Sequence, residues 1–198
     1  MIKRVTVFCA SSAKIDKYYI DEAYELGRML AQNGIELLYG GGKIGLMGAV
    51  SAGALSAGGR IIGVIPKFME NLELGRKDIY ELRVVRDMHE RVSMLINDSD
   101  MLIALPGGVG TYDELMQALA WKTLGLIIKP ILIVNTNNFF AHIIKALKHA
   151  EREGFMHVLN EHLWSEINSL DEIMSLIEES NKFNKIININ SGELWSDM

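Results

Sequence analysis

Short apolar segments rich in β-branched residues alternate along this chain with longer segments that have the spacing of amphipathic helices. The apolar segments are four to six residues long and hydrophobic at most positions, a pattern typical of strands buried on both faces. Strands and helices that alternate in this way form a parallel sheet covered by helices on both faces. The sequence therefore predicts an α/β fold with a Rossmann-like, doubly wound parallel sheet.

The alternation continues through most of the chain, whose 198 residues are enough for about one domain with its own core. Strands are expected at residues 3–8, 35–39, 60–65, 81–85, 101–105 and 131–134. Helices are expected at residues 16–33, 46–58, 88–98, 111–124 and 138–152. The tail is less periodic, with a further helix expected at 169–180 and a late edge strand at 185–189. We expect one domain over residues 1–198, in which the tail after about residue 181 could be peripheral.

Composition excludes several classes of protein. The 20 lysines and arginines against 25 aspartates and glutamates give a net charge of −5, which offers no general attraction to nucleic acid. The only cysteine, Cys9, rules out an internal disulfide or a multi-cysteine metal site, and the five histidines lack tight ligand spacing. The sequence contains no apolar run of 18 residues and no signal peptide at its start. We therefore expect a soluble, cytoplasmic protein without a metal and without a nucleic acid or membrane partner.

Two glycine clusters follow predicted strands. The first spans residues 40–48 and the second spans residues 106–114, each directly ahead of a predicted helix. In an open α/β sheet, ligands bind outside the carboxyl ends of the strands. Glycine lets backbone amides approach a ligand closely, and a helix N-terminus carries partial positive charge. The clusters therefore predict a site for phosphate or another anion.

The first cluster contains G-x-G-x-x-G at Gly40, Gly42 and Gly45. A nicotinamide cofactor site also requires an acidic residue at the end of the next strand. That strand ends in Pro66 and Lys67, so the pattern does not favour a dinucleotide. Glycines used only for tight turns and helix packing remain an alternative for this cluster.

The second cluster leads into Thr111 and Glu114, which have the spacing of a capping box. In that interpretation Glu114 returns to the backbone amide of Thr111 and has no catalytic role. The alternative is that an acidic side chain beside a bound sugar phosphate stabilises a cationic sugar or activates water. The sequence of this segment alone leaves both interpretations open.

The whole segment Pro106–Glu114, PGGVGTYDE, is similar to the PGGxGTxxE signature of the Lonely Guy (LOG) family, which comprises cytokinin riboside 5′-monophosphate phosphoribohydrolases. Further blocks occur in family order: FCASS at 8–12, YGGGKIGLMG at 39–48, GVIPK at 63–67, DMHER at 87–91, Trp121, Leu124-Gly125 and Lys129-Pro130. The resemblance covers roughly residues 3–155. It implies a nucleotide-binding domain and hydrolysis of the N-glycosidic bond of a nucleoside 5′-monophosphate, either AMP or a cytokinin riboside monophosphate. The products would be a free base and ribose 5-phosphate. The resemblance also implies a homodimer, and we expect no cofactor.

The resemblance assigns the catalytic roles to Arg91 and Glu114. A carboxylate is suited to this chemistry because glycosidic cleavage passes through an oxocarbenium-like state that a negative charge stabilises. The remaining positions expected to contact substrate are Ser11, Gly41, Gly42, Glu73, Met88, Gly107, Gly108, Val109, Gly110, Thr111, Tyr112 and Asp113. Among these, the amides of the second glycine cluster and the Thr111 hydroxyl would hold the phosphate.

Several of these residues also have structural interpretations. Arg91 could be a solvated side chain paired with Asp87 or Glu90, and Asp113 could serve only the helix dipole. Met88 and Trp121 could pack in the core, Ser11 could cap a helix, and Cys9 could be a small buried residue. Three positions depart from the family pattern: Val92 replaces a common lysine, Ala120 replaces a threonine, and a histidine after Gly125 is missing. We expect the first change to remove a cation from the site.

Three other functions are alternatives for a chain of this kind. A non-catalytic nucleotide carrier that resembles molybdenum cofactor carriers is the main alternative. A DNA-processing module conflicts with the acidic charge and the lack of a basic cluster. Lysine decarboxylation requires pyridoxal phosphate on a lysine Schiff base, and nothing around the lysines suggests that arrangement.

Overall fold

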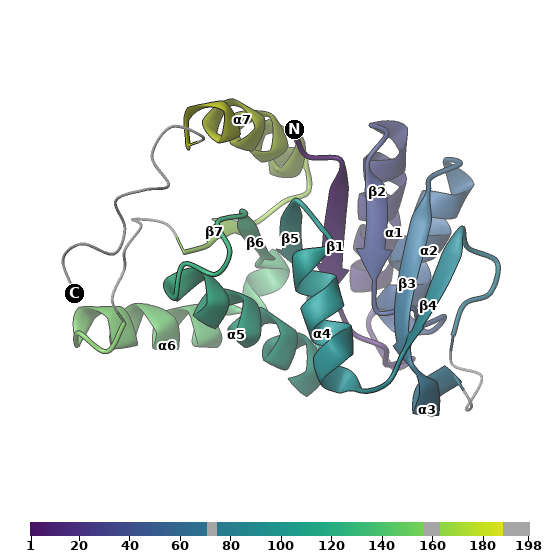
Figure 1. Ribbon diagram of the computed structural model, residues 1–198, viewed down its shortest axis with the longest axis horizontal. Helices are drawn as coiled ribbons and strands as arrows, with labels where there is room; N and C mark the ends of the chain where they lie inside the picture. The colour runs from purple at the N-terminus through teal and green to yellow at the C-terminus, as the bar shows by residue number, and fades with distance from the viewer. Residues whose placement is uncertain (71–74, 157–162, 188–198) are drawn as a thin grey trace.

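A seven-stranded parallel sheet forms the centre of the computed structural model, which describes residues 1–70, 75–156 and 163–187 (Figure 1). The strand order is β4-β3-β2-β1-β5-β6-β7, and every neighbouring pair is parallel. The strands are β1 (Arg4–Phe8), β2 (Glu36–Tyr39), β3 (Ile61–Pro66), β4 (Glu81–Val85), β5 (Met101–Ala104), β6 (Ile131–Val134) and β7 (Ser165–Ile167). The predicted Rossmann-like sheet and its first six strands are confirmed, whereas the three-residue β7 was not predicted.

Helices cover both faces of the sheet (Figure 1). On one face lie α1 (Lys17–Gln32), α2 (Gly45–Ser56) and the start of α7 (Asp171–Ile187). The other face is covered by α4 (Met88–Asn97), α5 (Val109–Thr123) and α6 (Ala141–Arg152). A short helix, α3 (Lys67–Glu70), follows β3, and a 3-10 turn at Thr136–Asn138 follows β6. None of the described helices is long and apolar enough to cross a membrane.

The central strand β1 contributes to both layers of the core. Val5 and Val7 belong to the cluster that packs against α1 and α2, whereas Phe8 belongs to the cluster beneath α4 and α5. This alternation follows from the two-residue period of a strand. The buried Thr6 hydroxyl lies on the second face and donates a 2.6 Å hydrogen bond to the Leu95 carbonyl of α4. The helix that carries Arg91 is therefore fixed directly to the centre of the sheet.

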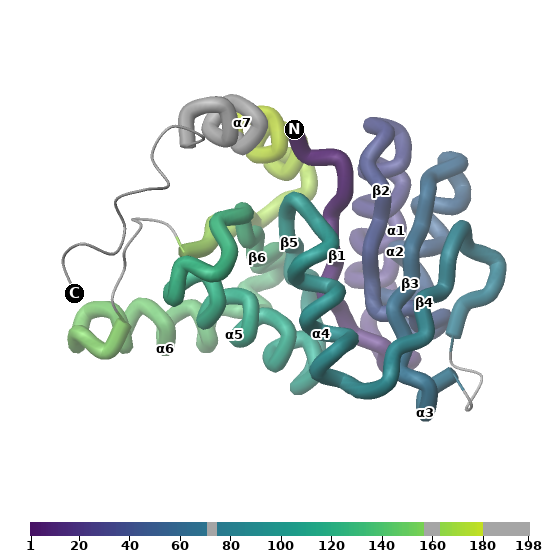
Figure 2. The backbone as a smooth tube through the Cα atoms, in the orientation of Figure 1, coloured from purple at the N-terminus to yellow at the C-terminus, as the bar shows by residue number. Residues whose placement is uncertain are grey.

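The direction in which strands are added reverses at β1. Figure 2 shows β2, β3 and β4 on one side of β1 and β5 and β6 on the other. Such a reversal opens a crevice at the carboxyl ends of the two strands where it occurs, and ligands bind there in open α/β sheets. Both glycine clusters lie at this edge, one after β2 and one after β5.

The expected edge strand at residues 185–189 is wrong as far as the structure describes it. Residues 185–187 continue α7, and residues 188 and 189 lie outside the described part of the chain. The helix begins two residues later than expected and buries Ile173 and Ile177 against the sheet. A four-residue spacing of buried residues is helical, so apolar periodicity decides the conformation over the β-branched composition of the later residues.

Candidate active site

The start of α4 is fixed by its own acidic residues. Asp87 is the N-cap and accepts a 2.9 Å hydrogen bond from the Glu90 amide, while the Glu90 carboxylate accepts hydrogen bonds from the backbone and side chain of Arg86. These contacts use the two acidic residues that could otherwise have paired with Arg91. The solvated interpretation of Arg91 is therefore wrong, because its side chain turns toward the sheet instead.

Arg91 and Glu114 form a buried ion pair between α4 and α5. Nη1 of Arg91 donates a 2.8 Å hydrogen bond to Oε1 of Glu114, and only 4% of Arg91 and 3% of Glu114 are exposed. Nε of Arg91 donates a 3.2 Å hydrogen bond to the carbonyl of Val64 in β3. The guanidinium is thus held in a fixed orientation against the carboxyl edge of the sheet.

Burial changes the acidity of the glutamate. The pKa of Glu114 is raised to about 7 because desolvation disfavours the carboxylate, an effect that the positive charge of Arg91 opposes only in part. The pKa of the buried Cys9 thiol is also raised, mainly by burial and secondly by the negative charge of Glu114. Cys9 is therefore a small, neutral, buried side chain near the pair, as its structural interpretation predicted.

The first glycine cluster makes room for this pair. A β-carbon on Gly40 would overlap Nη2 of Arg91, so only glycine lets the guanidinium lie against the end of β2. Gly41 has a φ of 76°, a conformation that side chains disfavour, and its carbonyl accepts a 2.8 Å hydrogen bond from the Arg76 amide. Gly42 pairs with Gly75 in an isolated antiparallel bridge. These three glycines therefore have packing and turn roles at the end of β2.

The second glycine cluster forms the exposed beginning of α5. The helix has Gly108 as its N-cap with no side-chain cap. The capping-box interpretation is therefore wrong, because Thr111 is already the third helical residue and Glu114 bonds to Arg91. Gly108, Val109 and Gly110 are exposed, and a β-carbon on either glycine would meet no atom within 4 Å. The first amides of a helix are free of intrahelical partners and are suited to bind an anion.

Thr111 lies behind these exposed positions. It is 3% exposed, and Gly107 must be glycine because a β-carbon there would overlap the Thr111 hydroxyl. Thr111 and Glu114 are three residues apart on α5, so they lie on the same face and are separated by about 4.5 Å along the helix axis. One helix therefore carries both the exposed N-terminal amides and the buried acid.

The other predicted positions differ in their exposure and in their contacts. Asp113 is exposed and accepts a hydrogen bond from Gln117, and Tyr112 packs edge-to-face on Phe140 with ring centroids 5.9 Å apart. Ser11 is exposed on the loop after β1, and Met88 is exposed at the start of α4. Glu73 lies outside the described residues.

Val92 does not face the site. It is 1% exposed and lies in the apolar cluster beneath α4 and α5. The expectation that this residue removes a cation from the site is wrong, since a side chain at position 92 packs into the core. The Val64 carbonyl is a further partner of Arg91, and no sequence signal predicts it because it is a backbone group.

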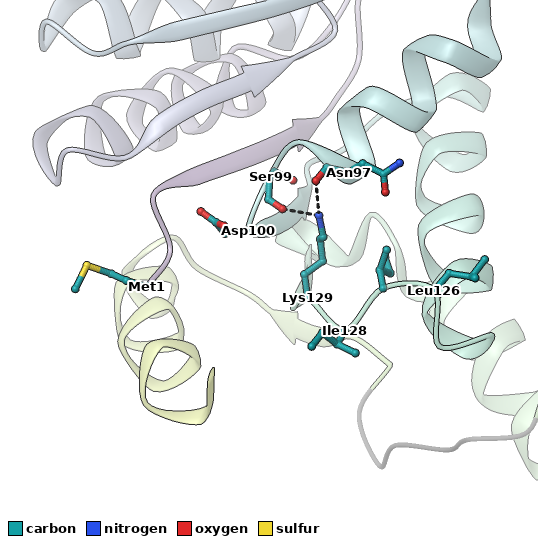
Figure 3. Close-up of a pocket in the computed structure, with 8 residues that line it drawn as sticks. Met1, Asn97, Ser99, Asp100, Leu126, Ile128 and Lys129 are labelled. Atoms are coloured by element: carbon teal, nitrogen blue, oxygen red, sulfur yellow. Dashed lines mark hydrogen bonds between the residues drawn. The ribbon is translucent and has the colours of Figure 1, made fainter. Parts of the chain in front are cut away.

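A pocket lies at the opposite edge of the sheet. It has a volume of about 540 Å³ and is lined by residues before β1, β5 and β6, including Met1, Asp100 and Lys129 (Figure 3). Nζ of Lys129 donates hydrogen bonds to the carbonyls of Asn97, the last residue of α4, and of Ser99 in the loop that follows. This pocket lies at the amino ends of the strands, and neither Arg91 nor Glu114 lines it. Among the described residues, no group of three or more histidine, cysteine, aspartate or glutamate side chains could hold a metal ion.

Taken together, the fold and this centre define a Rossmann-like α/β protein in which a helix N-terminus, open for an anion, adjoins a buried arginine–glutamate pair. A sequence model of a family described as "Possible lysine decarboxylase" matches residues 47–177. Cytokinin riboside 5′-monophosphate phosphoribohydrolase LOG1 of Arabidopsis thaliana is 38% identical over 177 residues, which are 89% of this chain and 83% of that protein. The corresponding enzyme LOG3 of the same plant is 40% identical over 154 residues, 78% of this chain and 72% of that protein. The chain therefore belongs to the LOG family.

Solved structures support the fold alone. The molybdenum cofactor carrier protein of Chlamydomonas reinhardtii superposes with a TM-score of 0.71 at 21% identity and covers 92% of this chain and 99% of that protein. The molybdenum cofactor binding protein of Rippkaea orientalis gives a TM-score of 0.68 at 23% identity. These similarities agree with the parallel sheet and say nothing about the ligand of this chain.

Proposed function

We propose that this chain is a phosphoribohydrolase that hydrolyses the N-glycosidic bond of a nucleoside 5′-monophosphate, with AMP and cytokinin riboside monophosphates as the substrate class. The observation that carries the proposal is the buried ion pair of Arg91 and Glu114 beside the open N-terminus of α5. Family membership and the 38% identity to a named phosphoribohydrolase support the same activity.

The geometry of α5 suggests how a nucleotide lies in the site. The 5′-phosphate accepts hydrogen bonds from the backbone amides of Gly108, Gly110 and Thr111, where the helix dipole favours negative charge. A ribose then extends along the helix toward Glu114, three residues further on. This orientation places the anomeric carbon C1′ beside the carboxylate and the base beyond it, toward Arg91.

The reaction then needs only water. The bond between C1′ and the base nitrogen breaks with its electron pair moving to the base, and the oxocarbenium-like ribose is stabilised by the Glu114 carboxylate. A water oxygen bonds to C1′, and Glu114 accepts the proton that this water loses. Glu114 then gives this proton to the negatively charged base, so the products are a neutral base and ribose 5-phosphate. A pKa near 7 is well matched to a group that accepts and releases a proton at neutral pH.

Arg91 has two roles in this scheme. Its bond to Oε1 orients the glutamate, and its positive charge keeps part of the Glu114 population ionised despite burial. Neither residue of the pair forms a Schiff base, so this centre does not support the decarboxylase chemistry in the family description. The pair also favours an enzyme over a carrier, because binding a phosphate does not require a buried acid.

The test is incubation of the purified protein with AMP and with a prenylated AMP, followed by chromatography for free base and ribose 5-phosphate. The expected result is equimolar release of both products, which a Glu114→Gln variant fails to give while it still binds nucleotide. Nucleotide binding without release from any nucleoside monophosphate would contradict the proposal and favour a carrier.

We further propose a single domain and a homodimer. Leu124, Leu126 and Ile128 expose apolar side chains on the segment after α5, and a second copy of the chain could cover them. Light scattering coupled to size exclusion should give twice the 22.1 kDa chain mass. A monomer at micromolar concentration would contradict this expectation.

A further inference from the structure

A second pocket adjoins the N-terminus of α5, and neither Arg91 nor Glu114 is among the residues that line it. It has a volume of about 360 Å³, and we call it the flanking pocket. The residues that line it include Lys14, Asp16, Tyr19, Gly107, Gly108 and Phe139. Gly107 and Gly108 thus belong both to its wall and to the loop that precedes α5. The pocket and the phosphate position are therefore neighbours with a shared backbone wall.

The two neighbours of the anion site lie in different directions. Arg91, which bonds to Glu114, also bonds to Val64 of β3 and lies against Gly40 at the end of β2. The flanking pocket is lined instead by the start of α1 and by Phe139, which follows β6. A nucleotide whose ribose extends toward Glu114 therefore leaves the flanking pocket free for a group attached to the other side of its phosphate.

The walls of the pocket are aromatic and held in place. The rings of Tyr19 and Phe139 meet edge-to-face with centroids 6.2 Å apart, and Phe139 packs in turn on the buried Phe140 at 5.1 Å. Asn137 and Asn138 precede Phe139 with φ angles of 53° and 58°, a left-handed conformation that costs energy and persists only where surrounding contacts enforce it. The ring of Phe139 is thus placed by a specific turn, so the wall is preorganised.

The rim of the pocket carries one donor and one acceptor. Among the described residues, no carboxylate lies within ion-pair distance of Lys14, so its ammonium is available to a ligand. The Asp16 carboxylate uses Oδ1 to accept a 2.8 Å hydrogen bond from the Tyr18 amide at the start of α1, which leaves Oδ2 as an acceptor. The two charges cancel, so the pocket does not favour a second phosphate. Aromatic walls with a donor and an acceptor at the rim fit a planar base.

We propose that the flanking pocket binds the second nucleoside of a dinucleoside monophosphate, whose bridging phosphate occupies the N-terminus of α5. This inference rests on the proposed function, because the phosphate position and the direction of the ribose come from it. It extends the substrate class from nucleoside 5′-monophosphates to nucleoside 5′-phosphodiesters. Stacking of a base on an aromatic ring contributes roughly tenfold to affinity, which is the effect to be measured.

The test compares two diesters of equal charge by isothermal titration calorimetry. Adenylyl-(3′→5′)-adenosine carries a second nucleoside, whereas the methyl ester of AMP does not. Measurements use the Glu114→Gln variant so that ligand is not consumed. The expected result is about tenfold tighter binding of the dinucleoside. Equal affinities, or no binding of either diester, would overturn the inference.

Variants locate the effect. Tyr19→Leu keeps an apolar side chain against the core but removes the ring, and Lys14→Ala removes the rim donor. Tyr19→Leu is expected to abolish most of the tenfold difference and Lys14→Ala to reduce it, while both variants bind the methyl ester as before. Tyr24→Leu is the matched control, because Tyr24 is an exposed tyrosine of the same helix outside the pocket lining. A preference for the dinucleoside that survives both pocket variants would also overturn the inference.

Hydrolysis of AMP by the wild-type protein is measured separately. If AMP is hydrolysed but the two diesters bind equally, the flanking-pocket proposal fails alone. If AMP is not hydrolysed, the proposed function fails, whatever the diesters show.

Discussion

Gly40 and Arg91 fit together only because Gly40 has no side chain: a β-carbon at that position would overlap Nη2 of the guanidinium and lie 2.8 Å from Cε of Met47. Gly40 comes from the turn after β2 and Arg91 from α4, so this contact joins two segments that are 51 residues apart in the sequence. The orientation of Arg91, and through it that of Glu114, depends on this glycine.

Replacing Gly40 with alanine should therefore damage catalysis through Arg91. Displacement of a positioned group by about 1 Å can cost roughly 100-fold in rate, so Gly40→Ala should lower kcat/KM for AMP by about that factor. The control is the double variant Gly40→Ala, Arg91→Ala, which should be no less active than Arg91→Ala alone. Additive losses would show that Gly40 acts by some other route.

The rate should depend on the ionisation of Glu114. Because the carboxylate is the form that stabilises the oxocarbenium-like state and accepts a proton from water, kcat should rise as pH increases through about 7 and then level off. A Glu114→Gln variant should show only a small residual rate without this inflection. A wild-type rate that instead falls as pH rises through 7 would assign Glu114 the role of an acid.

Glu114 should also make stability depend on pH. Its pKa is raised from 4.5 to about 7, so between these values the folded protein holds a proton that the unfolded chain has released. The folded state then binds more protons, and the free energy of unfolding falls as pH rises from about 4.5 to 7, by at most about 3 kcal/mol. Urea unfolding at several pH values should show this slope in the wild type and a shallower one in Glu114→Gln.

Gly110 offers a test in which stability and binding move in opposite directions. A β-carbon there meets no protein atom within 4 Å, and alanine favours a helix over glycine by up to about 1 kcal/mol. Gly110→Ala should therefore leave the thermal midpoint unchanged or slightly higher. The added methyl group would occupy space that the phosphate needs, so KM for AMP should rise at least about tenfold. An unchanged KM would remove the phosphate from this helix end.

Lys129 should affect stability without affecting the site directly. Its ammonium donates hydrogen bonds to the carbonyls of Asn97, the last residue of α4, and of Ser99 in the loop that follows, at the edge of the sheet away from Arg91 (Figure 3). Hydrogen bonds to charged groups contribute about 1.5–3 kcal/mol. Lys129→Met should lower the thermal midpoint while KM for AMP stays near the wild-type value. A large rise in KM at unchanged stability would contradict this separation.

The sequence by itself determined the sheet, most of its strands and the two glycine clusters at its carboxyl edge, because buried strands and amphipathic helices are specified by local periodicity. It also pointed to Arg91 and Glu114 through the family motifs. Local pattern failed where the partner was distant. The capping box at Thr111 and Glu114 had the correct spacing, yet the glutamate bonds to an arginine 23 residues earlier.

Only the tertiary structure decided what these residues do together. In the folded protein Arg91 and Glu114 are buried against each other, and this burial raises the pKa of the glutamate. The fold also places Gly40 against the guanidinium and packs Val92 in the core. It also brought Tyr19 and Phe139 together beside the anion site, although 120 residues separate them. The physical reason is that desolvation and steric fit depend on which atoms meet in space, and the order of residues along the chain does not contain that information.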